Sequence, residues 1–283
     1  MEERYKEIEK SIMTTYRKKI WNQFVKAIRE FEMIKDGDKI AVCISGGKDS
    51  FLLAKCMQEI QRHKKMNFEL IFLVMNPGYN ELNREKIIEN AKILNVPITM
   101  FETNIFNAVF NIENNPCYIC ARMRRGHLYK KAKELGCNKI ALGHHFDDVI
   151  ETILMGMMYG SQFQTMMPKL HSTFHEGMEL IRPLYYVKEE DVLRWRDWNK
   201  LEFIQCACRF TETYEANHNE DGLSKREEMK QLIKELRKVN PKVDLNIYNS
   251  TRNVNLSTII SYKKGEEVHT FLDDYENRSE NIF

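Results

Sequence analysis

The chain has 283 residues, of which 43% are hydrophobic and 30% are charged, and its formal net charge at pH 7 is +2. This size and apolar content allow a large core without disulfides, and the charge balance neither requires nor excludes a polyanionic partner. No apolar run could span a bilayer, and the N-terminal MEERYKEIEK lacks the features of a signal peptide, so we expect a cytoplasmic protein without a membrane partner and with reduced cysteines.

The predicted elements alternate between helices and strands. Apolar residues at near-helical spacing predict one amphipathic helix over about residues 5–31. Short apolar and β-branched runs predict strands at residues 39–44, 69–75, 97–101, 139–142 and 179–181. Further helices are expected at residues 188–201 and 225–238, and strand or loop is expected in the tail from Pro241. The alternation predicts an α/β fold with a doubly wound, mostly parallel sheet.

The same pattern suggests three regions without an internal repeat or a low-complexity linker. Residues 1–36 form the predicted N-terminal helical region, and residues 37–211 form the predicted catalytic core. Residues 212–283 form a predicted charged helix and tail. We therefore predict one core domain with an elaboration at each end.

The stretch SGGKDS follows the first predicted strand and opens the next helix. Ser45, Gly46 and Gly47 allow a sharp turn with outward N–H groups, and the helix adds its positive N-terminal end. This is not a Walker A loop, which would need glycine in place of Val42 and a hydroxyl residue in place of Asp49. The stretch matches the pyrophosphate-binding loop of the PP-loop superfamily. A turn without a function is the alternative.

The loop residues have distinct expected roles. Asp49 is expected to hold Mg²⁺, because a triphosphate normally carries that cation and a carboxylate is its usual protein ligand. The remaining loop residues are expected to hold the phosphates of ATP: Ser45, Gly46, Gly47, Lys48 and Ser50.

Two pairs of cysteines form a second motif. Cys117 and Cys120 lie one turn apart at a predicted helix start, and Cys206 and Cys208 follow much later in the chain. Four thiolates would suit tetrahedral zinc, three would suit an iron–sulfur cluster with one open iron, and paired core cysteines are the third possibility. The other three cysteines fit better as small buried side chains: Cys43, Cys56 and Cys137.

The third motif is ALGHHFDDVIET, a second turn from a strand to a helix. Asp147 and Asp148 fall at the helix start, where capping alone could explain them. In a parallel sheet this turn opens on the same edge as SGGKDS, which makes Gly143 and Asp148 candidates for the ligand crevice. His144 and His145 receive no proton-transfer role.

Together, SGGKDS, CYICARMRRGHLYKKAKELGCNKIALGHHFDDVIET and QCAC resemble the TtcA/TtuA family of PP-loop tRNA thiolation enzymes. The resemblance extends from about Phe24 through Cys208 and is greatest to the 2-thiocytidine branch. It implies an ATP-dependent enzyme that adenylates C2 of cytidine 32 in the anticodon loop of tRNA and replaces the oxygen with sulfur.

The resemblance also implies a set of site residues. A 4Fe-4S cluster would be held by Cys117, Cys120 and Cys206, with Asp148 and Arg124 as catalytic helpers. The family further implies a homodimer and a sulfide donor such as a cysteine desulfurase. The spacing Cys206-Ala-Cys208 departs from the usual CxxC, so Cys208 is the alternative third ligand. CxxC pairs do not flank the core, which argues against the zinc-finger-bearing 2-thiouridine branch.

Two basic surfaces are candidates for RNA contact. One follows the first cysteine pair and comprises Arg122, Arg124, Arg125, Lys130, Lys131 and Lys133. The other is the N-terminal helix, with Arg17, Lys18, Lys19 and Lys26. A solvated helix face would have the same composition.

Three other functions remain open from the sequence. A PP-loop ligase that uses ammonia or an amine, such as a lysidine synthetase, would leave the cysteines without a role. A zinc-stabilised nucleotide-binding regulator would leave GHHFDD without one. The third is a sulfur transferase of the same fold that acts on a different nucleotide or on a small molecule.

Overall fold

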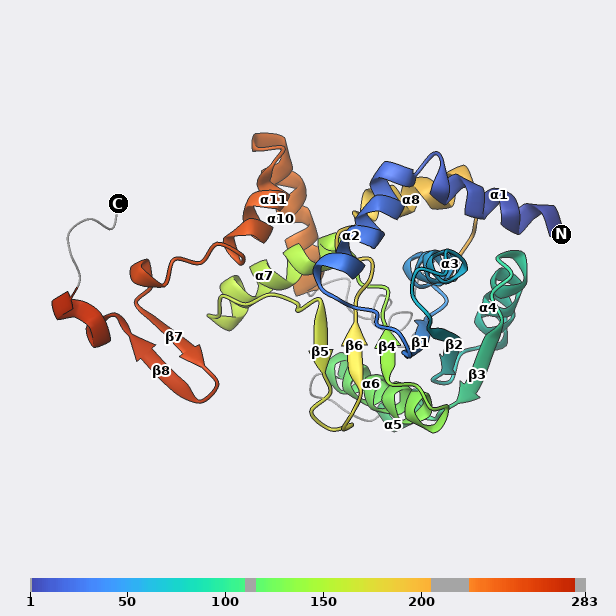
Figure 1. The fold of residues 1–283 in the computed structure, drawn as a ribbon, viewed down its shortest axis with the longest axis horizontal. Coiled ribbons are helices and arrows are strands. Elements are labelled where there is room, and N and C mark those ends of the chain that lie inside the picture. Colours follow the sequence, from blue (N-terminus) through green and yellow to red (C-terminus); the bar gives the residue numbers. More distant parts are fainter. Residues whose placement is uncertain (1, 110–115, 205–223, 278–283) are drawn as a thin grey trace. The chain divides into compact units, whose positions relative to one another are not determined.

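The structure is a computed structural model that describes residues 2–109, 116–204 and 224–277 (Figure 1). The strands are β1 (Lys39–Ile44), β2 (Glu69–Asn76), β3 (Ile98–Glu102), β4 (Lys139–Ala141), β5 (Lys169–His171), β6 (Glu179–Ile181), β7 (Ser261–Lys264) and β8 (Glu267–Thr270). The α-helices are α1 (Glu2–Met13), α2 (Asn22–Glu30), α3 (Lys48–Arg62), α4 (Glu81–Ile93), α5 (Ile105–Val109), α6 (Pro116–Glu134), α7 (Phe146–Gly160), α8 (Glu189–Trp198), α10 (Lys225–Val239) and α11 (Val243–Ser250). Short helical segments are η1 (Arg17–Trp21), η2 (Leu256–Thr258) and η3 (Phe271–Asn277).

The central sheet has six strands in the order β3-β2-β1-β4-β6-β5. All of its pairings are parallel except that of β5 with β6, which is antiparallel. The predicted doubly wound, mostly parallel sheet is confirmed. The sequence did not predict β5, because its three residues KLH carry no apolar run and are half-buried or exposed.

The sheet is covered on both faces, as its hydrophobic strands predict. On β1, Ala41 and Cys43 pack with Tyr129 and Ala132 of α6. Ile40 and the other intervening β1 residues are buried on the opposite face, because side chains alternate along a strand. In Figure 1, α3 and α8 lie on the side of the sheet away from α6.

The N-terminal region is helical, but the prediction of one continuous helix was wrong. After α1 the chain makes a turn, passes through the π-helical segment η1 and continues as α2. The break begins at Thr14, whose hydroxyl donates to the carbonyl of Lys10 at 2.7 Å, a side-chain bond that competes with regular helix geometry. The predicted apolar face is buried nonetheless: Ile12, Ile20, Phe24 and Ile28.

The chain forms two compact units. The first comprises residues 1–149 and 166–224, and the second comprises residues 150–165 and 225–283. The predicted N-terminal region lies in the first unit. The boundary predicted at residue 211 falls outside the described residues, so that division stays a prediction.

The second unit contains the remainder of α7, helices α10 and α11, and the β7–β8 hairpin. Within it, the buried carboxylate of Glu151 accepts from Nε of Arg226 at 2.7 Å. The β7–β8 hairpin agrees with the expectation of strand or loop after Pro241, whereas helix α11 departs from it. Helix α11 forms because Asp244 and Tyr248, four residues apart, share a buried helix face and Asp244 accepts from Arg237 at 2.9 Å.

None of the described helices is both long enough and apolar enough to span a bilayer.

Candidate functional site

The SGGKDS stretch forms a tight turn between β1 and α3. Gly46 has a φ of +91°, and a Cβ atom there would collide with the side chains of Ile204 and Ile87. Gly47 is the N-cap residue, with extended backbone, and α3 begins at Lys48. Glycine at position 46 is therefore required both by conformation and by space.

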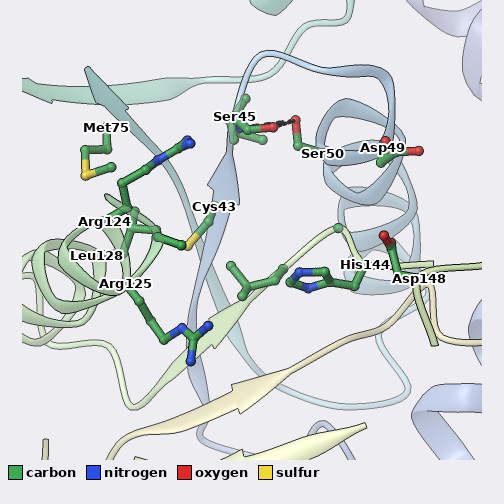
Figure 2. Close-up of a pocket in the computed structure, with 14 residues that line it drawn as sticks. Cys43, Ser45, Asp49, Ser50, Met75, Arg124, Arg125, Leu128, His144 and Asp148 are labelled. Atoms are coloured by element: carbon green, nitrogen blue, oxygen red, sulfur yellow. Dashed lines mark hydrogen bonds between the residues drawn. The ribbon is translucent and has the colours of Figure 1, made fainter. Parts of the chain in front are cut away.

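Ser50 holds this turn closed from inside. Its hydroxyl donates to the carbonyl of Gly47 at 2.8 Å and accepts from the backbone N of Ser45 at 3.2 Å. The two serine hydroxyls are also bonded, at 3.3 Å, as Figure 2 shows. Ser50 is only 4% exposed. The turn is thus organised in advance of any ligand, as a phosphate cradle requires.

The second turn, GHHFDD, lies against the first. A Cβ atom at Gly143 would come within 3.1 Å of the carbonyl carbon of Asp49 and the backbone N of Ser50. Such contacts are tighter than ordinary packing, so glycine allows the two backbones to approach this closely. The predicted convergence of the two turns at one sheet edge is confirmed.

Asp148 and His145 cap the start of α7. The carboxylate of Asp148 accepts from the backbone N of His145 at 2.9 Å, and the backbone N of Asp148 donates to Nδ1 of His145 at 3.4 Å. Asp147 instead accepts from the backbone N of Glu189 at 2.7 Å. The capping alternative therefore holds for Asp148, although Asp148 also lines the cavity described below.

Glu189 is a site residue that the sequence analysis missed. Its carboxylate lies 3.1 Å from Nζ of Lys48, which is also 3.1 Å from the carboxylate of Asp49. Burial lowers the pKa of Lys48, but the two carboxylates outweigh that effect and raise it. Lys48 is therefore held in place as a cation. Only its position at the start of a helix with three acidic residues in its first turn could have drawn attention to Glu189.

Asp49 combines this ion pair with an unsatisfied oxygen. Its Oδ2 is paired with Lys48, whereas its Oδ1 is buried and has no hydrogen-bond partner in the described chain. Nε2 of His145 lies 3.9 Å from this oxygen, beyond hydrogen-bond distance. A buried carboxylate oxygen without a partner beside a phosphate cradle fits a Mg²⁺ ligand.

The two turns and α6 line a partly open cavity of about 370 Å³. Its lining includes Ser45, Asp49, Ser50, Gly143, His144 and Asp148 from the two turns, and Ala121, Arg124, Arg125 and Leu128 from α6. In Figure 2, the α6 side chains lie across the cavity from Asp49 and Asp148. Arg124 extends toward the side of Ser45, whereas Arg125 extends away from it. The cavity therefore joins the SGGKDS turn, residues 45–50, which we call the phosphate turn, to the helix that begins with the first cysteine pair.

The structure describes only part of the predicted cluster site. Cys117 and Cys120 lie near the start of α6, and the half-buried Cys120 packs against Met75, Ile105 and Val109. The side chain of Cys117 is not among those described. Two cysteines spaced one turn apart at a helix start suit a shared metal centre.

The second cysteine pair, Cys206 and Cys208, lies outside the described residues. Ile204, the last described residue before it, packs against Gly46 of the phosphate turn.

The other cysteines are buried, as predicted. Cys43, Cys56 and Cys137 are between 0% and 6% exposed. Burial, with a smaller effect of Cys137, raises the pKa of the Cys43 thiol to about 12, and burial raises the pKa of Cys56 and Cys137 as well. These thiols stay protonated and serve as small core side chains.

Comparisons with known proteins identify relatives of this site. Residues 14–219 match the PP-loop domain family. A tRNA-cytidine(32) 2-sulfurtransferase of Neisseria meningitidis serogroup C is 40% identical over 186 residues, which cover 64% of this chain and 57% of that protein. The protein of the same name from Paraburkholderia xenovorans is 34% identical over 253 residues, which cover 87% and 71%. The first match thus spans little more than half of the relative.

A solved structure shares the fold. The U34-tRNA thiolase NcsA from Methanococcus maripaludis, determined with its [4Fe-4S] cluster, superposes with a TM-score of 0.63 at 22% identity. The superposition covers 86% of this chain and 80% of that one.

Proposed function

The chain belongs to the PP-loop family, and we propose that it is an ATP-dependent tRNA sulfurtransferase that converts a cytidine, at position 32 of the anticodon loop, to 2-thiocytidine. The observation that carries this proposal is the cavity that α6, which begins with Cys117 and Cys120, shares with the phosphate turn. Activation by a nucleotide and delivery of sulfur must meet at one base, and this cavity provides a common place.

The phosphate turn would bind ATP. The backbone N–H groups at Gly46 and Gly47, with Ser45 and the N-terminus of α3, would face the pyrophosphate, and Lys48 would add a fixed positive charge. Asp49 would hold Mg²⁺ through its unsatisfied oxygen. The pyrimidine carbonyl oxygen then attacks the α-phosphorus, pyrophosphate leaves, and the oxygen becomes part of a leaving group, AMP.

Sulfur would replace AMP at the same carbon. Cys117, Cys120 and Cys206 would hold a 4Fe-4S cluster, which supplies an open iron for sulfide when it is bound. Asp148 and Arg124 line the cavity between the two sets of groups. There, Arg124 would stabilise negative charge on the leaving phosphate, and Asp148 would orient the base.

The remaining elements of the proposal concern partners. Single-stranded loops expose bases for such chemistry, which agrees with an anticodon loop as the target, and the arginines of α6 offer contacts to its phosphates. A cytoplasmic location, a cysteine desulfurase as the source of sulfide and a homodimeric assembly belong to the same proposal.

The cluster is tested by anaerobic absorption spectroscopy with iron, sulfide and zinc analysis of the reconstituted protein. We expect a broad band near about 400 nm. Cys120→Ser should remove it, whereas Cys137→Ala, a change at a buried thiol away from the cavity, should retain it. Stoichiometric zinc without iron in the wild-type protein would contradict the proposal and favour a zinc-stabilised nucleotide-binding regulator.

The two parts of the site can be separated in the same experiment. Asp49→Ala should abolish formation of AMP while the absorption band remains, because Asp49 belongs to the phosphate turn and not to the cysteine motif. Loss of the band in Asp49→Ala would mean that the turn has been assigned the wrong role.

A further inference from the structure

Arg182 carries a buried charge that the proposed chemistry does not use. It follows β6 directly, at the sheet edge where the two ligand-binding turns lie, and it is only 5% exposed. Its Nη1 donates to the carbonyl oxygen of Met167, while its Nε is buried without a hydrogen-bond partner. In the described part of the chain, no carboxylate forms an ion pair with it.

A buried guanidinium without a counter-ion is costly. The backbone N of Leu142, a residue that lines the cavity, donates to the carbonyl of Ile181 at 3.0 Å, so Arg182 follows a residue at the edge of the cavity that Arg125 also lines. Burial is the main reason that the pKa of Arg182 is lowered to about 10, and the positive charge of Arg125 lowers it further. Tyr185, Tyr129 and Asp148 offset these effects only in part. This arrangement is unfavourable for the protein alone and would be relieved by an anion between the two arginines.

Arg125 provides the access that Arg182 lacks. It is exposed, lines the cavity and has no ion pair among the described residues. Its side chain extends away from Ser45 and Ser50, as Figure 2 shows. An anion held there would occupy the end of the cavity remote from the phosphate turn.

We propose that Arg125 and Arg182 form a phosphate-binding subsite, and that its occupant is a backbone phosphate of the RNA substrate. Arg125 contacts the phosphate with its planar fork of N–H donors, and Arg182 supplies a second positive charge from the protein interior. The phosphate turn already provides for the pyrophosphate of ATP, so a separate anion subsite suits the other phosphate-bearing substrate. The assignment to RNA rests on the proposed function.

The test measures two affinities for each variant, one for an unmodified tRNA transcript with cytidine at position 32 and one for ATP. Arg125→Gln is expected to weaken tRNA binding about tenfold and to reduce the salt dependence by about one counter-ion, while ATP affinity stays unchanged. Arg84→Gln is the matched control: it removes the same charge from a residue of α4 that lies outside the cavity and has a side chain 41% exposed, and it should change neither affinity.

Arg182→Met tests the buried partner. It should weaken tRNA binding as well, and the double variant should lose less than the product of the two single losses, because both arginines serve one phosphate. A purely structural role of Arg182 would give independent effects. Arg125→Gln keeps the test decisive even if Arg182→Met does not fold, because Arg125 is exposed.

Three outcomes would overturn the proposal in distinct ways. If Arg125→Gln binds tRNA as tightly as Arg84→Gln does and ATP affinity is also unchanged, there is no such subsite. If ATP affinity falls instead, the phosphate belongs to the nucleotide and the assignment to RNA is wrong. If the wild-type protein binds ATP but no tRNA, the proposed function itself fails. The ATP affinity of Arg125→Gln, compared with that of Arg84→Gln, then decides whether Arg125 binds a phosphate of the nucleotide.

Discussion

Gly46 is the residue on which the shape of the phosphate turn depends most directly. Its φ of +91° disfavours any other residue, and a Cβ atom would meet Ile87 at 2.8 Å. At Gly47, by contrast, φ is −83° and the nearest atom to an added Cβ would be Oγ of Ser45 at 3.7 Å. Two adjacent glycines therefore have different physical reasons to be present.

This difference predicts the stability of two alanine variants. Gly46→Ala should lower the free energy of unfolding by about 2 kcal/mol or more, because it combines backbone strain with a steric clash. Gly47→Ala should leave it nearly unchanged. Denaturant unfolding of both variants measures the contrast, and equal stabilities would show that the turn relaxes around Gly46.

The residues of the site differ in how far the sequence revealed them. SGGKDS and GHHFDD were recognisable because each is a short contiguous turn between a strand and a helix. Glu189 was not, because its pairing with Lys48 joins residues 141 positions apart in the chain. Arg182 was missed for a similar reason: its lack of a counter-ion is a property of three-dimensional surroundings.

At the level of elements, α1 is anchored to α3 by a small network of charges. Glu9 accepts from Nη1 and Nη2 of Arg62 at 2.6 and 2.8 Å and is paired with Nζ of Lys55. The Lys55 side chain is fully buried, whereas that of Arg62 is 46% exposed. Glu9 is thus the carboxylate that compensates a buried cation on the helix that follows the phosphate turn.

The network predicts unequal effects for its members. Glu9→Gln should destabilise the protein by about 3 kcal/mol, because it leaves the buried Lys55 without a carboxylate. Arg62→Gln should cost less than about 1 kcal/mol, because the Arg62 side chain is 46% exposed and Glu9 keeps its pair with Lys55. Thermal and denaturant unfolding measure both, and a larger loss for Arg62→Gln would contradict the account.

The contribution of Glu9 should also depend on pH. Burial raises its pKa, but hydrogen bonds from Arg62 and Lys55 and their charges outweigh that effect and lower it. A carboxylate with a lowered pKa stabilises the fold above the ordinary value of 4.5 and loses this contribution as the pH falls further. The stability difference between wild type and Glu9→Gln should therefore shrink below that pH, and a constant difference would contradict the assignment.

The sequence predicted those helices and strands whose pattern of apolar residues is regular and extends over several residues. The five parallel strands and the helices between them follow from apolar runs and turn residues, and four of these strands, β1, β2, β4 and β6, are buried over most of their length. The break between α1 and α2 and the three-residue strand β5 were not predictable, because a local hydroxyl bond and a short edge pairing leave little trace in the hydrophobic pattern.

At the scale of the whole molecule, the sequence predicted the fold class but not the two compact units. Helix α7 is continuous, yet its residues up to Val149 belong to the first unit and those from Ile150 to the second. A boundary inside a regular helix has no proline, glycine or charge run to mark it. The catalytic account uses only the first unit, which holds every residue that lines the cavity.

The most direct test of the central claim is an anaerobic thiolation assay. The reconstituted protein is incubated with an unmodified tRNA transcript, ATP, Mg²⁺ and sulfide, and the digested nucleosides and AMP are measured by mass spectrometry. We predict 2-thiocytidine only when ATP is present, together with AMP, and neither product with Asp49→Ala. AMP without any thionucleoside, or thionucleoside formed without ATP, would contradict the proposed function.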